Sequence, residues 1–365
     1  MNVVKPTLRL SEANAAGAQT LSRVDVRTGF GLVGLLLAYG LVIDRLAHPS
    51  LAQLMISLGN FGALSLYSGL LVACVFMLLC LVRPDQRASL GNRAYWLAIA
   101  CVLTTLTFPF FAAFKELVLP MRGFLWDRTF AHVGRAIFGQ SPWTITHVYF
   151  GTVAGTRILD AAYRSLLPLM YGLPLVSGAM IIDARLRFRI LFTWTASWIL
   201  IGTLAAWVFA SAGPCFYNSF VAYDPDYANL QSRLAEIGRQ ASAQGHPIAS
   251  LQYESGLMLT YRTHSFAPGG GISAMPSMHV AMMTLVALVA WQFNRLLGIA
   301  AWFLVLAVWI ATIHFGWHYF VDGPVGAAMM IALWILAKRV SAVLHPIPQQ
   351  TAKCSTRLRR SGREP

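Results

Sequence analysis

The sequence predicts an all-α membrane protein whose chain crosses the bilayer several times. Of its 365 residues, 57% are hydrophobic and 12% are charged, whereas soluble domains carry about 25% charged residues. The mean hydropathy is +0.59. Several apolar stretches reach the length of about 20 residues that a helix needs to span a bilayer. Because no internal repeat and no break in composition divides the chain, we expect one helical membrane domain.

Eight apolar stretches are expected to be membrane-spanning helices. The segment from Pro49 to Phe61 is also apolar, but it is short and contains Gly59 and Asn60. We therefore expect it to be an interfacial or re-entrant piece, separate from the spans. The expected spans cover residues of about 30–47, 64–82, 95–114, 165–182, 190–210, 277–293, 297–314 and 320–337.

The positions of the basic residues predict the orientation of the chain. Cytoplasmic loops carry an excess of Lys and Arg, and here these residues gather around 83–93, 185–189, 295 and 338–339, and in the tail after 353. All these groups fall on one side of the membrane if both termini are cytoplasmic. The same distribution explains the net charge of +14, so the charge implies no nucleic-acid partner.

This orientation divides the chain into three parts. Residues 1–28 are expected to form a polar cytoplasmic segment, residues 29–340 a helical membrane catalytic domain, and residues 341–365 a basic cytoplasmic tail. Two long loops, of about residues 115–164 and 211–276, then lie on the outer side. Without a recognisable cleaved signal, the chain fits a bacterial inner membrane with a periplasmic site; a secretory-pathway membrane with a lumenal site is the alternative.

The first outer loop is expected to contain amphipathic helices that form a lid. Its aromatic and apolar residues, among them Trp126, Phe130 and Trp143, recur near helical spacing. The second outer loop contains a polar helical stretch near residues 227–244 and ends in a glycine run before the chain re-enters the membrane. Long loops of this kind are usually functional or disordered, and their composition favours function.

The end of the second loop is a candidate phosphate site. Ser277 and His279 follow a run that includes Gly270 and Gly271, and Pro276 suits the first turn of a helix. Backbone amides at a helix N-terminus bind anions, and glycine allows a close approach. The Ser277 hydroxyl would donate to a phosphate oxygen, while His279 would act as general acid and base. The competing interpretation is an ordinary span start with a hydrogen-bonded histidine.

A second motif lies 39 residues after His279, where His318 precedes Asp322 at the mouth of the last span. Residues four apart lie on one face of a helix, so the carboxylate would hold one ring nitrogen and leave the other as nucleophile or base. An unpaired carboxylate would be costly there. A purely structural pair is the alternative, but a second histidine on the same outer face favours catalysis.

A zinc site formed by His279, His314, His318 and Asp322 is a further competing interpretation. Only His314 and His318 have the spacing of metal ligands, and the chain has neither an outer cysteine cluster nor a His-Glu-x-x-His motif. The sequence therefore predicts a site that uses no metal and no other cofactor.

The two histidine motifs resemble those of a known family. Pro276-Ser277-Met278-His279 and His318-Tyr319-Phe320-Val321-Asp322 are similar to the second and third signature motifs of the type 2 phosphatidic acid phosphatase superfamily. Their short forms, Pro-Ser-x-His and His-Tyr-x-x-Asp, are similar to the inositol phosphorylceramide synthase branch and its bacterial relatives. Residues 211–217 and 126–143 resemble further segments of this branch, so the resemblance covers most of residues 110–335.

This resemblance implies that the bundle of about eight transmembrane helices contains a six-helix phosphatidic acid phosphatase-like core. It also implies metal-independent phosphoryl transfer through a phosphohistidine, in which His318 would be the nucleophile, Asp322 would orient it, and His279 would protonate the departing alkoxide. The implied partners are membrane lipids, as phospholipid or sphingolipid phosphates, at the outer membrane face. Water or a lipid hydroxyl would then accept the phosphoryl group, so hydrolysis and transfer are both open.

The other phosphate-binding candidates depart from the family pattern. The phosphatase branch has an Arg six residues before the third-motif histidine, where this chain has Thr312. Its first motif is Lys, six residues, Arg, Pro; Lys115 and Arg122 keep this spacing, but Gly123 replaces the proline. Arg262 is a further candidate by its position in the second outer loop. The full set of phosphate-binding candidates is Ser277, Gly270, Gly271, Lys115, Arg122 and Arg262.

Two other classes of function compete with phosphoryl transfer. A transporter or channel would need ionisable residues in the middle of several spans and broken helices at the midplane, whereas here the ionisable residues gather at span ends. A catalytically inactive family member would act as a lipid binder. Nothing requires that interpretation, because His279, His318 and Asp322 are all present.

Overall fold

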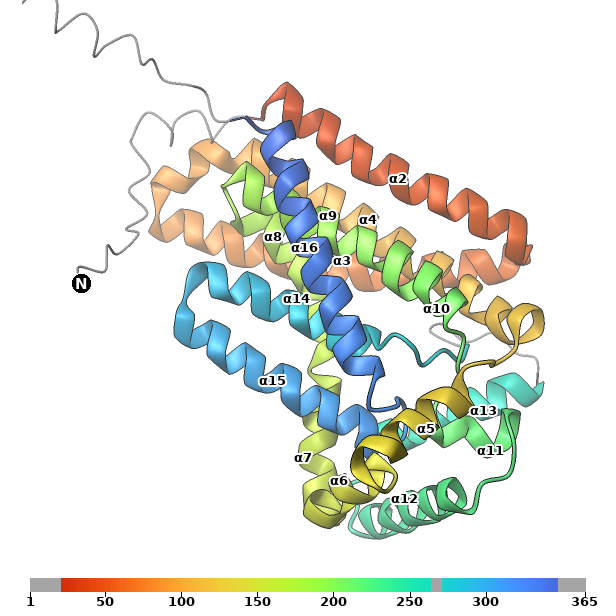
Figure 1. The fold of residues 1–365 in the computed structure, drawn as a ribbon. Coiled ribbons are helices and arrows are strands. Elements are labelled where there is room, and N and C mark those ends of the chain that lie inside the picture. The colour runs from red at the N-terminus through yellow and green to blue at the C-terminus, as the bar shows by residue number, and fades with distance from the viewer. Residues whose placement is uncertain (1–20, 264–270, 347–365) are drawn as a thin grey trace, which may run out of the picture.

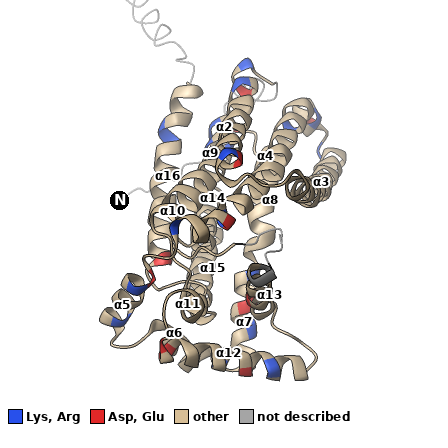
Figure 2. Ribbon diagram, turned by 90° about the vertical axis from the view of Figure 1, so that its right-hand side faces the viewer, with Lys and Arg blue, Asp and Glu red and all other residues tan. Residues whose placement is uncertain are grey.

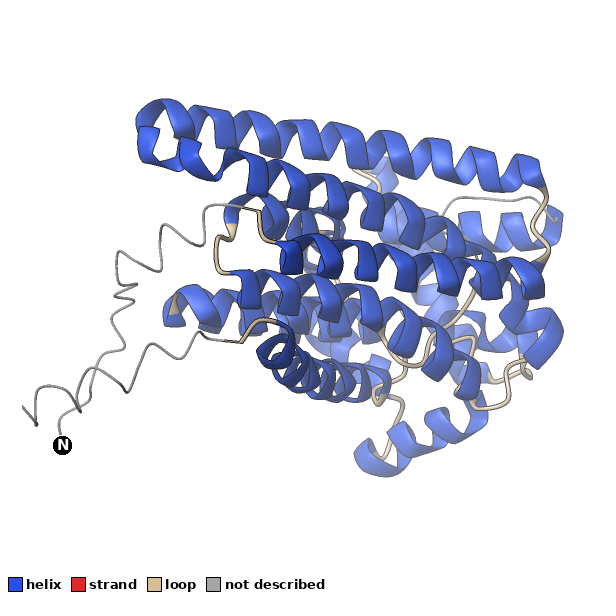
Figure 3. Ribbon diagram, turned by 90° about the horizontal axis from the view of Figure 1, so that it is seen from above, coloured by secondary structure: helices blue, strands red, loops and turns tan. Residues whose placement is uncertain are grey.

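The computed structural model describes residues 21–263 and 271–346, and within these ranges the chain forms helices and no β-strand (Figures 1 and 3). The long helices run alongside one another as a bundle, and shorter helices gather at one of its ends (Figure 2). The expected all-α membrane fold is confirmed, because several described helices have the length and composition of membrane spans.

Six helical segments of the described chain are long and apolar enough to cross a membrane. They correspond to six of the expected spans. The other two expected spans form α8 and α14, which have 15 and 16 residues and pack among the long helices. The helices that correspond to the eight expected spans are α2 (Arg23–Ala47), α3 (Leu51–Val82), α4 (Leu90–Leu117), α8 (Leu166–Met180), α9 (Ala184–Ile199), α14 (Met278–Phe293), α15 (Arg295–His314) and α16 (Asp322–Leu344).

Two of the long segments are extended by irregular helical turns. A 3-10 turn (Pro84–Ser89) precedes α4 and a π-helical turn (Val118–Arg122) follows it. A second π-helical turn (Leu200–Ala205) joins α9 to the short α10 (Ala206–Val208). The two π-helical turns extend these segments toward the end of the bundle where the short helices lie.

The segment from Pro49 to Phe61 is not a separate interfacial piece, so this expectation was wrong. From Leu51 onward it forms the first part of α3, which continues without a break to Val82. A capping box starts the helix, in which the Ser50 hydroxyl accepts from the Gln53 amide at 3.2 Å. One glycine destabilises a helix by only about 1 kcal/mol. A break in the helix would leave backbone N–H and C=O groups without hydrogen bonds inside the bilayer, so α3 continues through Gly59.

The interior of the bundle forms around α4, which packs against α2, α3 and α8. Trp96 and Leu103 of α4 and Trp194 of α9 are fully buried. Phe108 stacks on Tyr171 of α8 with ring centroids 4.4 Å apart. Helices α14, α15 and α16 form a second group, which α9 joins to the first by packing against α16. This packing fixes where the ends of α14, α15 and α16 meet.

The two expected outer loops are largely helical, and their helices gather at the end of the bundle where α14 begins and α15 ends (Figures 1 and 2). We call this the site end. Phe130, Trp143 and Tyr227 of these helices pack against Phe315 and Tyr319, which follow α15. The helices are α5 (Asp127–Phe138), α6 (Pro142–Phe150), α7 (Val153–Arg164), α11 (Tyr217–Phe220), α12 (Pro225–Ala243) and α13 (Ala249–Thr263), with a 3-10 turn (Pro214–Phe216) before α11.

The opposite end of the bundle carries a buried ion pair. Arg187 of α9 donates to Oδ1 of Asp25 at 2.9 Å, and their side chains are only 1% and 6% exposed. Trp96 Nε1 donates to the same oxygen at 3.2 Å. Nearby, Arg93 of α4 donates to the Ala179 carbonyl at 2.9 Å. Arg93 and Arg187 belong to two groups of basic residues that we predict to be cytoplasmic. They lie at the same end of the bundle.

We expect Asp25→Ala to lower the free energy of unfolding by about 3–5 kcal/mol, because it leaves the Arg187 guanidinium buried without its partner. The double variant Asp25→Leu, Arg187→Met removes both charges and should recover much of the loss. Thermal unfolding in detergent measures both changes. Glu236→Ala, which breaks an exposed ion pair with Arg239, is the control and should unfold like the wild type. Wild-type stability of Asp25→Ala would contradict this account.

Candidate active site

Two histidines from separate parts of the chain lie next to each other at the site end. His279 is the second residue of α14, and His318 lies in the turn between α15 and α16. Their ring centroids are 5.7 Å apart and their planes are inclined by 65°. The chain leaves the site along α14 and returns along α15, and these two helices pack against each other. The start of α14 and the turn after α15 therefore lie close together, which brings the two rings next to each other.

Asp322 holds one nitrogen of the His318 ring. Its Oδ2 accepts from His318 Nδ1 at 3.3 Å and from the Tyr319 amide at 2.9 Å, and the side chain is fully buried. With Asp322 ionised, its carboxylate only accepts hydrogen bonds, so Nδ1 carries the proton and Nε2 keeps its lone pair. His318 Nε2 is therefore the atom that can attack an electrophile.

The helical geometry expected for this pair differs from the structure. His318 lies in a turn, and Asp322 is the first residue of α16. The turn uses a φ of +70° at Gly316, which glycine adopts without steric cost. The His318 amide donates back to the Thr312 carbonyl at 3.2 Å. A turn of the backbone, rather than a shared helix face, thus brings the ring to the carboxylate.

Ser277 is the N-cap of α14, and its hydroxyl oxygen accepts from the Val280 amide at 3.4 Å. Pro276 therefore precedes the helix, whereas we expected it in the first turn. A serine at the N-cap satisfies an amide that has no partner within the helix, which proline cannot do. The Ser277 amide donates to the Asp322 carbonyl at 3.1 Å, which joins the two histidine motifs through their backbones.

Two glycines allow close approach of the backbones around the site. A Cβ atom at Gly326 of α16 would lie 2.6 Å from the Ser277 carbonyl oxygen. A Cβ atom at Gly271, where φ is +83°, would lie 2.5 Å from Cβ of Lys115. The chain that enters α14 therefore passes directly against Lys115, which is half-buried and lies within electrostatic range of His279. The structure therefore brings Ser277 and Lys115 close to His279, and Gly271 against Lys115.

The other cationic candidates are not brought to the histidines in the described part of the chain. Arg122 is exposed, and its Nε donates to the Trp207 carbonyl at 3.3 Å. It lies in the π-helical turn beyond α4, so the spacing it shares with Lys115 does not place both cations on one face. The side chain of Arg262 and all of Gly270 lie outside the described residues.

Tyr163 of α7 packs against His279 and was not identified from the sequence. The two rings are stacked with centroids 4.4 Å apart and planes inclined by 21°. Tyr163 is also near-parallel to Trp317, at 6.4 Å. These contacts set the plane of the His279 ring. No local motif marks Tyr163, because its role depends on how α7 packs against the end of α15.

Asp127 is a second buried carboxylate near the site, and the motifs did not identify it either. It begins α5, and its Oδ1 accepts from the Gly213 amide at 3.0 Å and the Tyr319 hydroxyl at 2.7 Å. The Ala212 amide lies 3.0 Å from both carboxylate oxygens. Burial raises the pKa of Asp127 to about 6, although these hydrogen bonds oppose the rise. Its only sequence signal is its place beside Trp126 in an amphipathic segment.

His314, a member of the alternative zinc set, faces away from the other proposed ligands. Its ring stacks on His147 with centroids 4.1 Å apart, and its Nε2 lies 3.0 Å from the Thr156 hydroxyl. Among the described residues, no three His, Cys, Asp or Glu side chains form a group suited to a metal ion. His314 therefore helps to pack α6 and α7 against α15.

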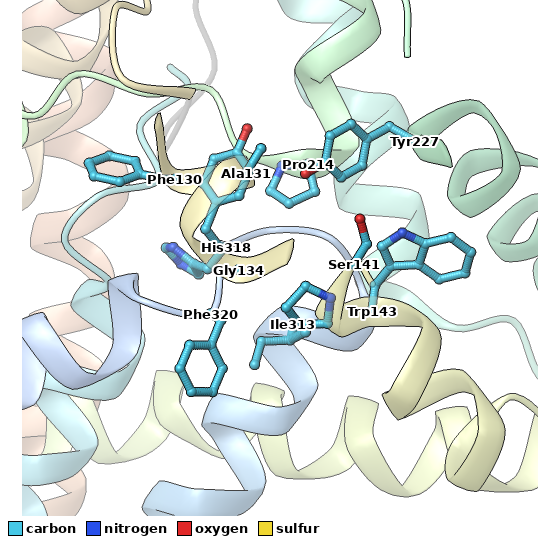
Figure 4. A pocket seen from close by; sticks show the side chains of 12 residues that line it. Phe130, Ala131, Gly134, Ser141, Trp143, Pro214, Tyr227, Ile313, His318 and Phe320 are labelled. Carbon is cyan, nitrogen blue, oxygen red and sulfur yellow. The ribbon is translucent and has the colours of Figure 1, made fainter. Parts of the chain in front are cut away.

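A small cavity of about 10 Å³ lies against His318 and Tyr319, where Figure 4 shows aromatic side chains around it. This volume holds about one water molecule. Trp143 lines the cavity, and its buried Nε1 has no hydrogen-bond partner among the described residues. Because the cavity is too small for a lipid phosphate, it does not provide the route by which a lipid would reach His318.

The fold and the site define a class of protein, a polytopic helical membrane protein with a carboxylate-oriented histidine beside a second histidine. A sequence profile of the PAP2 superfamily matches residues 128–336, which is more than half of the chain. The chain belongs to the PAP2 superfamily. The matched range includes Ser277, His279, His318 and Asp322, and membership supports a phosphatase- or phosphotransferase-type function. No curated protein and no solved structure matches the chain in the same comparisons.

We expect Asp127→Asn to stabilise the protein at neutral pH relative to the wild type. The Asp127 pKa is raised from 3.8 to about 6, so the folded state retains this proton where the unfolded state has lost it. The associated stability is complete below about pH 4 and is lost as the pH rises through about 6. This loss corresponds to about 3 kcal/mol, and asparagine avoids it while keeping an acceptor oxygen.

Denaturant unfolding at about pH 4, 5.5 and 7.5 measures this difference. The stability of Asp127→Asn relative to the wild type should increase across this range and level off above pH 7. Asp85→Asn, at an exposed aspartate, is the matched control and should show no such increase. A constant difference between Asp127→Asn and the wild type at all three pH values would contradict the expectation.

Proposed function

We propose that the protein is an integral-membrane lipid phosphotransferase or phosphatase that works through a phosphohistidine on His318. One arrangement carries the proposal: Asp322 holds His318 through Nδ1, and the His279 ring lies 5.7 Å from the His318 ring. This arrangement pairs an oriented nucleophile with an acid/base group. PAP2 superfamily membership supports chemistry of this class.

The proposed reaction has two steps with opposite proton transfers. In the first, His318 Nε2 attacks phosphorus, the bond from phosphorus to the leaving oxygen breaks, and protonated His279 gives its proton to that oxygen. In the second, neutral His279 takes a proton from water or from a lipid hydroxyl. The activated oxygen then attacks phosphorus and the bond to His318 breaks. Asp322 stabilises the positive charge that develops on the His318 ring.

Donors around the histidines would bind the phosphoryl oxygens. The Ser277 hydroxyl can still donate its proton, because it accepts rather than donates toward Val280. Lys115 supplies a positive charge near His279. Gly271 is in close contact with Lys115, so the backbone around Gly271 lies beside this charge. Preorganised donors of this kind stabilise the charge that develops in a phosphoryl-transfer transition state.

Features of the sequence support a substrate class and a membrane side for the proposed activity. The Pro-Ser-x-His and His-Tyr-x-x-Asp forms support the inositol phosphorylceramide synthase-like branch, and hence transfer of a phosphoalcohol head group between lipids over hydrolysis. The distribution of basic residues supports cytoplasmic termini and a site at the outer face. We propose that the membrane is a bacterial inner membrane. The acceptor that reaches His318 decides between transferase and hydrolase.

Wild-type protein incubated with phosphatidic acid labelled in its phosphate should acquire acid-labile, alkali-stable label. His318→Ala should abolish the label, because the nucleophile is gone. His279→Ala should slow turnover by about 100- to 10,000-fold, which is the usual contribution of a general acid/base group. His132→Ala, at an exposed histidine, is the control and should label normally. Chelators should leave the label unchanged, and a labelled His318→Ala would disprove the assigned nucleophile.

Phosphatidylinositol labelled in its head group distinguishes transfer from hydrolysis. With ceramide present, we expect the label to appear in a new lipid, because the ceramide hydroxyl would take the phosphoinositol group from His318. Thin-layer chromatography of the products measures this directly. If only free head group were released, at the same rate with and without the acceptor lipid, the protein would be a hydrolase and the transferase hypothesis would be wrong.

A further inference from the structure

One buried carboxylate is hydrogen-bonded to two segments that lead to the two histidines. Asp127 is 0% exposed. Its Oδ1 accepts from the Tyr319 hydroxyl at 2.7 Å and from the Gly213 amide at 3.0 Å. The Ala212 amide is shared between the two oxygens, at 3.0 Å from each.

The first of these segments leads to His318. Tyr319 follows His318 directly, and it is only 4% exposed. Its amide donates to Asp322 Oδ2 at 2.9 Å, the same oxygen that receives His318 Nδ1. The hydroxyl of Tyr319 bonds to Asp127 at the other end of the side chain. Tyr319 is therefore fixed at both ends, which fixes the backbone from which His318 projects.

The second segment leads to α14 and His279. Ser211 precedes Ala212, and its carbonyl accepts from the Ala274 amide at 2.8 Å. The Ser211 hydroxyl accepts from the Met275 amide at 3.1 Å. Ala274 and Met275 are close to the start of α14, so the segment bonded to Asp127 also holds the chain that enters this helix.

We propose that Asp127 is a positioning residue for phosphoryl transfer, which holds His318 through Tyr319 and the entry to α14 through Ala212 and Gly213. The inference rests on the proposed phosphohistidine function. Asp127 acts on the distance and angle between the two histidine rings, and a misplacement of about 1 Å between reacting groups can cost about 100-fold in rate. It lies one residue before the range that the PAP2 profile matches.

Tyr319→Phe tests the link to His318, because it removes the hydroxyl and keeps the ring that lies 6.0 Å from Phe130. With detergent-solubilised phosphatidic acid as the probe, we expect kcat to fall about 10-fold while KM changes less than about twofold. Asp127→Ala removes both links and should lower kcat about 100-fold. Asp127→Asn keeps an acceptor oxygen for the same donors and should retain kcat within about threefold of the wild type.

Three measurements separate positioning from general destabilisation. Tyr223→Phe, at a tyrosine that is 78% exposed, is the matched control and should keep wild-type kcat. In the Asp127→Ala background, Tyr319→Phe should cause no further loss, because the bond between them is already broken. Hydrogen exchange of residues 313–322 should speed up in Tyr319→Phe and Asp127→Ala but not in Tyr223→Phe, at temperatures well below unfolding.

Wild-type kcat in Tyr319→Phe would overturn the proposal, as would a 10-fold loss that persists in the Asp127→Ala background. It would also fail if Asp127→Asn were as slow as Asp127→Ala, because hydrogen bonding would then not be the cause. A wild-type protein that neither labels nor turns over lipid phosphate would disprove the phosphohistidine function itself. In that case unchanged exchange of residues 313–322 in Tyr319→Phe would disprove the tether separately.

Discussion

A carboxylate buried at the start of a membrane helix is costly unless hydrogen-bond donors reach it. Asp322 occupies this position, and its donors are the His318 ring and the Tyr319 amide. The turn between α15 and α16 must fold tightly to supply them. The Asp322 carbonyl also receives the Ser277 amide, which brings in the start of α14. The tautomer of His318 and its place beside His279 thus depend on the partners of one buried charge.

Composition and hydropathy were sufficient to predict the membrane helices, because a bilayer leaves an apolar stretch of that length few alternatives to a helix. The two histidines of the site could also be predicted from the sequence, because each belongs to a short motif. Tertiary contacts decided the rest. Lys115 and Arg122 keep the spacing of a phosphate-binding motif, but only Lys115 lies near His279, because Arg122 falls in a π-helical turn. Asp127 was missed because its partners lie 85 residues or more away in sequence.

The distribution of buried charges bears on the competing functions. A proton or ion path would require ionisable groups through the middle of the bundle. In the described chain, the Asp25–Arg187 pair lies at one end and the histidine site at the other. Apolar side chains such as Leu103 and Trp194 fill the space between these ends. This separation favours chemistry at one membrane face over passage through the bundle.

The contact between the starts of α14 and α16 has an electrostatic consequence. A helix carries about half a positive charge at its N-terminus, where its first amides lack partners within the helix. Because the Ser277 amide donates to the Asp322 carbonyl, the two N-termini converge beside both histidine rings. An anion there would experience two helix dipoles, and these would partly offset the positive charge missing at Thr312, where the phosphatase branch has arginine. This potential belongs to the backbone, so no single side-chain substitution removes it.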